Sequence, residues 1–283
     1  MGAGQMRFGF VLPNNWGIDD VTAVCDLAVE AEDLGLDSVW VNHHVVNIGY
    51  IADRLDDRPY HDALTVLTWA AARTSEVRLG TSVLVMPYLH PMVLAKALAT
   101  LDQLSDGRVI AGLGVGSLPE ENAVLRVIFD ERGRFGNEFI EILRSLWSPG
   151  PANHRGEFWS MSDVVASPKP AQDRLPIWIG GSGGPAQRRA VAHGEGWHPM
   201  CSVEGLARRM EQFVPMLERA GRARTDIVVA PRIDVSEVGD AAAVAAWADA
   251  GADELIVSAS GGSIETHREA LRHVAQLAAQ TAP

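Results

Sequence analysis

The strongest constraint on the fold is a strict alternation of short apolar runs with longer segments of helical periodicity. The apolar run 6–12 stops at Pro13, and apolar residues then recur at helical spacing from Val21 to Val29 before Gly35 ends the segment. Further apolar runs lie at 38–42, 77–86, 108–113, 176–179, 196–200, 226–235 and 254–258. Because strands alternate with helices throughout, the sequence predicts parallel strands.

Eight strand–helix units in 283 residues predict an α/β fold of the (β/α)8 TIM-barrel type, with a single domain spanning residues 1–283. The segment 148–174 holds Pro149, Pro151, Pro168 and Pro170, so it is expected to be an irregular excursion between strands four and five, with room for one short hairpin. The later helices are expected at 62–75, 91–104, 134–147, 185–193, 203–220, 241–250 and 263–279.

A Rossmann fold is the structural alternative. The run Gly112-Leu113-Gly114-Val115-Gly116 follows a strand, as a dinucleotide-binding fingerprint would. That fingerprint needs a further glycine at position 117, where Ser117 stands. The barrel is therefore the favoured prediction.

Composition restricts the partners and the compartment. Asp and Glu number 36 against 24 Lys and Arg, and the formal charge of −12 disfavours binding to nucleic acid or to an anionic membrane. No eighteen-residue apolar run and no secretory signal is visible, so we expect no membrane partner and a cytoplasmic location. The two cysteines, Cys25 and Cys201, form no spaced pair, so neither a disulfide framework nor a metal site is expected.

The active site of a TIM barrel lies where the carboxyl ends of its strands meet. Residues that follow strand one and end strand three are therefore expected to line a substrate pocket, namely Asn14, Trp16 and Met86. Strand four is followed by a close-approach turn, Gly114-Val115-Gly116-Ser117. Strand five is followed by Gly180-Gly181-Ser182-Gly183-Gly184, whose uncovered backbone N–H groups and following helix favour a phosphate site. A flexible glycine turn is the alternative there, and Arg188 and Arg189 could add charge.

Strand two is followed by His43 and His44. In an extended segment their side chains point to opposite sides, so we expect only one to serve a site, and a metal pair is disfavoured. The only lysines, Lys96 and Lys169, do not end strands, which disfavours the Schiff-base chemistry of an aldolase on the same fold.

Several sequence segments between residues 6 and 200 follow one another in the order seen in a known enzyme family. They are Asp37-Ser38-Val39-Trp40-Val41 leading to His44, Arg78 to Leu84, Leu101 to Arg108 running into Gly112 to Gly116, and Pro176 to Gly181. In these blocks the chain resembles the bacterial luciferase-like monooxygenase superfamily, and especially its coenzyme F420-dependent oxidoreductase branch. The resemblance implies an enzyme that transfers a hydride between C5 of the deazaflavin ring of F420 and a small organic substrate.

The resemblance also implies roles for single residues. It maps a cis peptide bond onto Ser82–Val83, which would support one face of the ring. It assigns the cofactor phosphate to the glycine loop 180–184 and the cofactor side chain to the turn 114–117. His44 matches a histidine near the reactive ring that helps a proton follow the hydride, and we expect His44 rather than His43 to be catalytic.

Two departures limit the resemblance. His43 stands where the family often has Asp, and Ser117 stands where some deazaflavin enzymes have Glu, which puts sugar-phosphate dehydrogenase activity in doubt. The alternatives are an FMN-dependent monooxygenase that uses O₂ and a non-catalytic flavin-binding barrel. The match over Gly80 to Leu84 favours F420 over FMN.

The segment 62–73 predicts an assembly. Leu64, Leu67 and Ala71 fit one inward face, but apolar residues also spread around the rest of this helix: Val66, Trp69, Ala70 and Ala72. Leaving a Trp side chain in water forfeits considerable stabilisation. We therefore expect a two-fold homodimer packed through this helix and the helix at 91–104, with cover from the loop 43–61 as the alternative.

Overall fold

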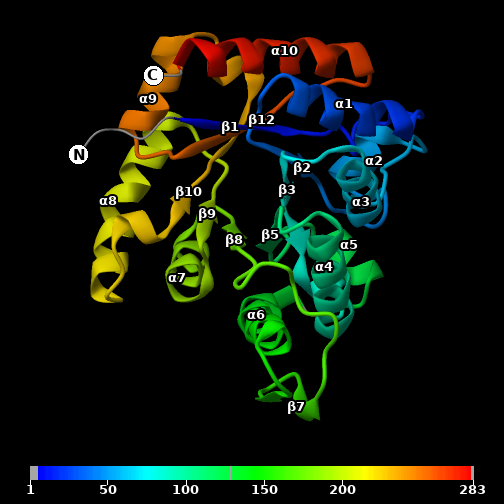
Figure 1. Cartoon of the computed structure of the whole chain (residues 1–283), viewed down its shortest axis with the longest axis vertical. Coiled ribbons are helices and arrows are strands. Elements are labelled where there is room, and N and C mark those ends of the chain that lie inside the picture. The colour runs from blue at the N-terminus through cyan, green and yellow to red at the C-terminus, as the bar shows by residue number, and fades with distance from the viewer. Residues whose placement is uncertain (1–5, 128, 282–283) are drawn as a thin grey trace.

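A curled sheet of parallel strands forms the centre of the protein, with helices around it (Figure 1). The computed structural model describes residues 6–127 and 129–281, so the outermost residues of the predicted 1–283 unit lie outside it. Neighbouring strands follow the order β10-β9-β8-β5-β3-β2-β1-β12-β11, and β4 pairs with β5. The strands are β1 Arg7–Val11, β2 Ser38–Val41, β3 Arg78–Thr81, β4 Leu84–Val85, β5 Val109–Gly114, β8 Ile177–Gly180, β9 Gly196–His198, β10 Val228–Val229, β11 Arg232–Asp234 and β12 Glu254–Ser258.

All eight predicted apolar runs form strands, but two of them are divided. The third run is split into β3 and β4 at the Ser82–Val83 peptide bond, which is cis, as the resemblance implied. The seventh run is split at Ala230-Pro231, and its two pieces pair with different neighbours. The piece β10 pairs with β9, while β11 pairs with β12, so the two pieces of this one run form the two ends of the strand order.

The predicted helices are present; Pro91–Leu104 has the expected bounds, and the others have ends that shift by one or two residues. Two short helices, α2 (Tyr50–Leu55) and α5 (Pro119–Val124), were not predicted. The other helices are α1 Val21–Asp33, α3 Ala63–Arg73, α4 Pro91–Leu104, α6 Arg132–Trp147, α7 Gly184–His193, α8 Val203–Arg219, α9 Ala241–Asp249 and α10 Ile264–Thr281. Across the part of the chain that the structure describes, none of them is long and apolar enough to cross a membrane.

The inward face of α3 differs from the one expected. The buried residues are Ala63, Val66, Leu67, Ala70 and Ala71, which recur at the spacing of one helical face. Leu64 is only partly buried, whereas Trp69 remains 53% exposed. A hollow of about 110 Å³ beside Trp69 is lined by residues of α1 and α3, so the segment 43–61 does not line it.

The excursion between α6 and β8 contains the expected hairpin, formed by β6 (Ala152–Arg155) and β7 (Ser160–Val164). Figure 1 shows it beside α6, away from the central sheet. The Glu138 carboxylate of α6 accepts backbone N–H groups of Glu157, Phe158 and Trp159 at 2.8–3.1 Å. These bonds fix the turn of the hairpin to the helix.

The inside of the sheet is filled by large rings. The rings of Trp40 and Trp178 lie 5.0 Å apart, and the ring of Trp40 stacks on that of His198 at 5.3 Å. Gly80 faces this cluster, and a Cβ atom there would lie 2.2 Å from Trp40. The glycine is therefore required to make room for the indole.

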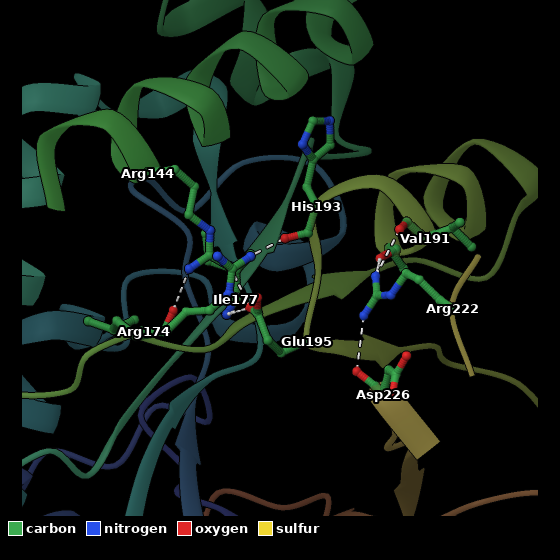
Figure 2. A network of polar contacts seen from close by, with 10 residues as sticks. Arg144, Arg174, Ile177, Val191, His193, Glu195, Arg222 and Asp226 are labelled. Atoms are coloured by element: carbon green, nitrogen blue, oxygen red, sulfur yellow. Dashed lines mark hydrogen bonds and ion pairs between the residues drawn. The ribbon is translucent and has the colours of Figure 1, made fainter. Parts of the chain in front are cut away.

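A network of hydrogen bonds and ion pairs holds the amino end of β8, the end that begins at Ile177 (Figure 2). The Glu195 carboxylate accepts the Ile177 N–H at 2.8 Å and the Arg174 Nε–H at 2.5 Å, and it also pairs with Arg144. Arg144 in turn donates to the carbonyls of Leu175 and His193. The network joins the ends of α6 and α7 to the start of β8.

Candidate active site

A cavity of about 420 Å³ opens among the residues that follow the carboxyl ends of the strands. Its size is within the range of small-molecule sites, about 300–1,000 Å³. Nine of the predicted site residues line it: His44, Ser82, Val83, Gly114, Val115, Gly116, Ser117, Gly180 and Gly181. The remaining lining residues are Asn15, Asn42, His43, Tyr50, Arg54, Tyr60, Val85, Met200 and Arg232.

Ser82 is held in place by a buried histidine. The Nδ1 atom of His198 lies 2.6 Å from the carbonyl oxygen of Ala230, and its Nε2 atom lies 2.9 Å from Ser82 Oγ. Because a carbonyl only accepts, Nδ1 carries the proton and Nε2 accepts the Ser82 hydroxyl proton. Burial lowers the pKa of His198 to about 4, so the ring is neutral near pH 7.

Val83 forms part of the pocket wall between two glycines. A Cβ atom on Gly114 would lie 2.5 Å from the Val83 side chain, and one on Gly180 would lie 2.8 Å from it. Glycine at both positions therefore lets β5 and β8 approach Val83 closely. The result is a wall of backbone and one branched side chain, against which a flat ring can lie.

His44 is paired with a buried carboxylate that the sequence did not reveal. Its Nδ1 atom lies 2.5 Å from Glu121 Oε2, and Glu121 Oε1 accepts the backbone N–H groups of Val45 and Val46. Burial alone would raise the pKa of Glu121, but the bonds from His44, Val45 and Val46 outweigh it and lower the pKa. An ionised Glu121 accepts the proton on Nδ1, which leaves Nε2 as the acceptor. That nitrogen lies 3.2 Å from the Tyr50 hydroxyl.

His43 borders the same cavity, so the expectation that the two histidines would face opposite sides is wrong. Strict alternation applies only within a strand, and β2 ends at Val41. His43 Nδ1 accepts the Val85 N–H at 3.1 Å, which ties the end of β2 to β4. Burial lowers the pKa of His43 to about 4, so this ring is neutral near pH 7.

The sequence pattern of the luciferase-like monooxygenase family matches residues 6–282. The chain belongs to this family. Over 213 residues, or 72% of this chain, the luciferase-like protein is 35% identical to F420-dependent glucose-6-phosphate dehydrogenase from Kineococcus radiotolerans. The match covers 60% of the length of that relative.

Solved structures confirm the fold of this luciferase-like chain. An F420-dependent secondary alcohol dehydrogenase in complex with an F420–acetone adduct superimposes with a TM-score of 0.84 at 17% identity, covering 99% of this chain and 100% of that one. The monooxygenase RslO1 from Streptomyces bottropensis gives 0.80 at 21% identity, covering 96% and 98%. Both kinds of enzyme therefore share the fold, so the fold does not choose between their chemistries.

The glycine loop of the luciferase-like protein is only partly at the cavity. Gly180 and Gly181 line it, whereas Ser182, Gly183 and Gly184 lie beyond, where α7 begins. Ser182 Oγ donates to the Met200 carbonyl at 2.6 Å and accepts the Met200 N–H at 3.0 Å, which fixes the loop. The Arg189 guanidinium is buried and donates to the Asn137 side chain and the Gly133 carbonyl. Of Arg188 and Arg189, which could have added charge to the phosphate site, only Arg188 is exposed.

The three residues predicted for the substrate pocket are not among those that line the cavity. Asn14 is fully buried, because its side chain donates to the carbonyls of Asn42 and His61 at 2.8 and 2.9 Å. Met86 is also fully buried. The ring of Trp16 lies under the Arg54 guanidinium, 4.5 Å from its central carbon.

The sequence reasoning also missed several lining residues. Tyr50 and Arg54 lie on the unpredicted α2, and Tyr60 follows it. Arg232 did carry a signal, because it is a charged residue inside the apolar run 226–235. Among the residues that the structure describes, no group of three or more His, Cys, Asp or Glu could hold a metal ion.

Proposed function

We propose that this luciferase-like protein is an F420-dependent oxidoreductase that transfers a hydride between the deazaflavin and a small organic substrate. The observation that carries the proposal is a single cavity that joins a glycine-rich wall to a histidine held by a buried carboxylate. The relative from Kineococcus radiotolerans, which is named as F420-dependent, supports the choice of cofactor. Its named substrate, glucose 6-phosphate, is not carried over, because His43 and Ser117 depart from the pattern expected of such enzymes.

The residues present fit a flat tricyclic cofactor. Ser82 and Val83 would support one face of the ring, with Gly114 to Ser117 beside its side chain and the loop 180–184 at its phosphate. When bound, the deazaflavin would supply the hydride acceptor or donor. The glycines at positions 114 and 180 leave room because no Cβ atom projects toward Val83.

In this proposal, His44 accepts the proton that the substrate loses when it is oxidised. During oxidation of an alcohol, the hydride leaves carbon, the hydroxyl proton goes to Nε2 of His44, and a carbonyl forms. Ionised Glu121 fixes the tautomer and stabilises the imidazolium that results. The Tyr50 hydroxyl occupies the hydrogen-bonding position at Nε2, so Tyr50 must either yield it to the substrate or pass the proton on.

F420 is expected to bind more tightly than FMN, and NAD(P) alone is not expected to bind in their place. The reasons are the glycine loop at 180–184 and the strand-three block around Ser82 and Val83. Fluorescence titration of the purified protein with each oxidised cofactor measures the two affinities. Equal or tighter binding of FMN would favour an O₂-using monooxygenase, and F420 binding without turnover of any substrate would favour a non-catalytic barrel.

We also propose that the sheet closes into an eight-stranded barrel within a single domain. The support is the divided seventh run, whose pieces pair with β9 and with β12. Between those pairs, Ala230 donates to the Trp197 carbonyl, and Ile256 donates to the Pro231 carbonyl. These bonds bridge the two ends of the strand order.

A two-fold homodimer through α3 and α4 is proposed for the assembly. Trp69 on α3 is 53% exposed and Val93 on α4 is 68% exposed. Trp69→Glu is expected to weaken or abolish the dimer, because a buried interface does not tolerate an unpaired charge. Sedimentation of both proteins at micromolar concentration tests this, and a monomeric wild type or an undisturbed mutant dimer would contradict it.

A cytoplasmic location is part of the proposal. Cys25 and Cys201 are free, which suits a reducing compartment. Burial raises the pKa of both thiols, so neither is an activated nucleophile.

A further inference from the structure

Two arginines line the active-site cavity, and neither forms an ion pair with a residue that the structure describes. Arg54 comes from α2 and Arg232 from β11, and no Asp or Glu is among the lining residues. The chain as a whole carries a charge of −12, so carboxylates are abundant elsewhere. Arginines such as Arg78, Arg144 and Arg268 do form ion pairs, whereas neither cavity arginine forms one with the described residues.

Arg232 is a shielded cation with only neutral partners. Its Nη1 atom donates to the Asn42 side chain and to the Ser82 carbonyl, the latter at 3.2 Å. Its Nε atom is buried and has no hydrogen-bond partner among the described residues. Burial lowers the pKa of its guanidinium, and the nearby positive charge of Arg54 lowers it further. Arg232 is only partly exposed, and a partly shielded cation without a counter-ion is unfavourable.

Arg54 and Tyr60 add unused donors to the same wall. Arg54 donates through Nη2 to the Asn15 carbonyl at 3.0 Å, but its Nε atom is buried and unpaired in the described part of the chain. The Tyr60 hydroxyl is likewise buried with no partner there. Three residues around one cavity therefore hold polar atoms whose hydrogen bonds are unmade. Native proteins leave few such atoms, and a cluster of donors indicates a missing acceptor.

We propose that Arg54 and Arg232 bind an anionic group of the substrate, a carboxylate or a phosphate. The inference rests on the proposed function and narrows its substrate class to small anionic alcohols or carbonyl compounds. Such an anion would reduce the uncompensated positive charge of this wall and could form charge-assisted hydrogen bonds with the two guanidinium groups. Because His44 borders the same cavity, one small molecule can present both the anionic group and the reacting carbon.

The test uses the protein without cofactor, so it does not depend on turnover. Isothermal titration with inorganic phosphate and with acetate is expected to show saturable binding of at least one. Arg54→Gln and Arg232→Gln are each expected to raise the Kd about 10- to 100-fold, the size of a lost charge-assisted hydrogen bond. Arg272→Gln, which removes an exposed charge on α10, is the matched control and should leave the Kd unchanged.

Other outcomes overturn the proposal. If Arg188→Gln weakens phosphate binding while the two cavity variants do not, the ion belongs to the glycine loop. If Arg232→Gln weakens F420 binding but not anion binding, the guanidinium serves the cofactor. Absence of saturable binding by either anion also overturns it. Should Arg232→Gln fail to fold, as judged by circular dichroism, Arg54→Gln decides alone. Failure of wild-type protein to bind F420, with the anion effects intact, would overturn the proposed function and leave this site standing.

Discussion

Replacing His44 with alanine is expected to lower kcat/KM for hydride transfer by about 10²- to 10⁴-fold, the usual contribution of a general acid–base group. The fold should survive, because His44 is only partly buried and its ring lies at the cavity rather than in the core. F420 affinity should change far less than turnover. Steady-state absorbance assays and cofactor titration on the same preparation separate these effects.

His43→Ala is the matched control for that result. His43 has its own structural task, accepting the Val85 N–H, so its loss should reduce stability more than it reduces the proton step. Glu121→Gln should lower the rate as well, because a neutral amide no longer stabilises the imidazolium of His44. A large loss in His43→Ala with near-normal His44→Ala would reverse the assignment of the catalytic histidine.

Gly112→Ala is expected to destabilise the protein by about 3 kcal/mol or more, or to prevent folding. A Cβ atom at Gly112 would lie 1.7 Å from the carbonyl oxygen of Thr81, and backbone cannot move aside as a side chain can. The clash would also separate β3 from β5 directly beside Ser82. The free energy of unfolding in urea measures the change.

Gly239→Ala provides the comparison for that variant. Gly239 has open space around it and lies in an exposed segment, so this change should stay within about 0.5 kcal/mol of the wild type. If Gly112→Ala were as stable as Gly239→Ala, the close approach of the two strands would be wrong.

Local periodicity predicts much of this fold, because each central strand is buried on both faces and therefore reads as an apolar run. The strand Glu254–Ser258 and the helix Pro91–Leu104 have the bounds expected from sequence. The helices α2 and α5 could not be found in this way, because each has six residues and is held by its surroundings rather than by its own propensity.

Some residues of the candidate site could likewise be predicted from the sequence, and others could not. His44, the turn 114–117, and Gly180 and Gly181 were predictable as cavity residues because they lie at the carboxyl ends of strands, whereas Ser182 to Gly184 lie beyond the cavity. Glu121 was not predictable, because 77 residues separate it from His44 and nothing in its neighbourhood distinguishes it from a surface carboxylate. The expected separation of His43 and His44 failed because the strand ends two residues before His43.

The network around Glu195 has a consequence for how this protein can change over time. It meets β8 at Ile177, while the cavity meets the same strand at Gly180, about 10 Å further along. Substitutions at such distances with no shared partners generally combine additively. In directed evolution, substitutions that stabilise the amino end of β8 could be introduced first. The added stability would then offset destabilising substitutions around the cavity that change the substrate, so the fold would be kept.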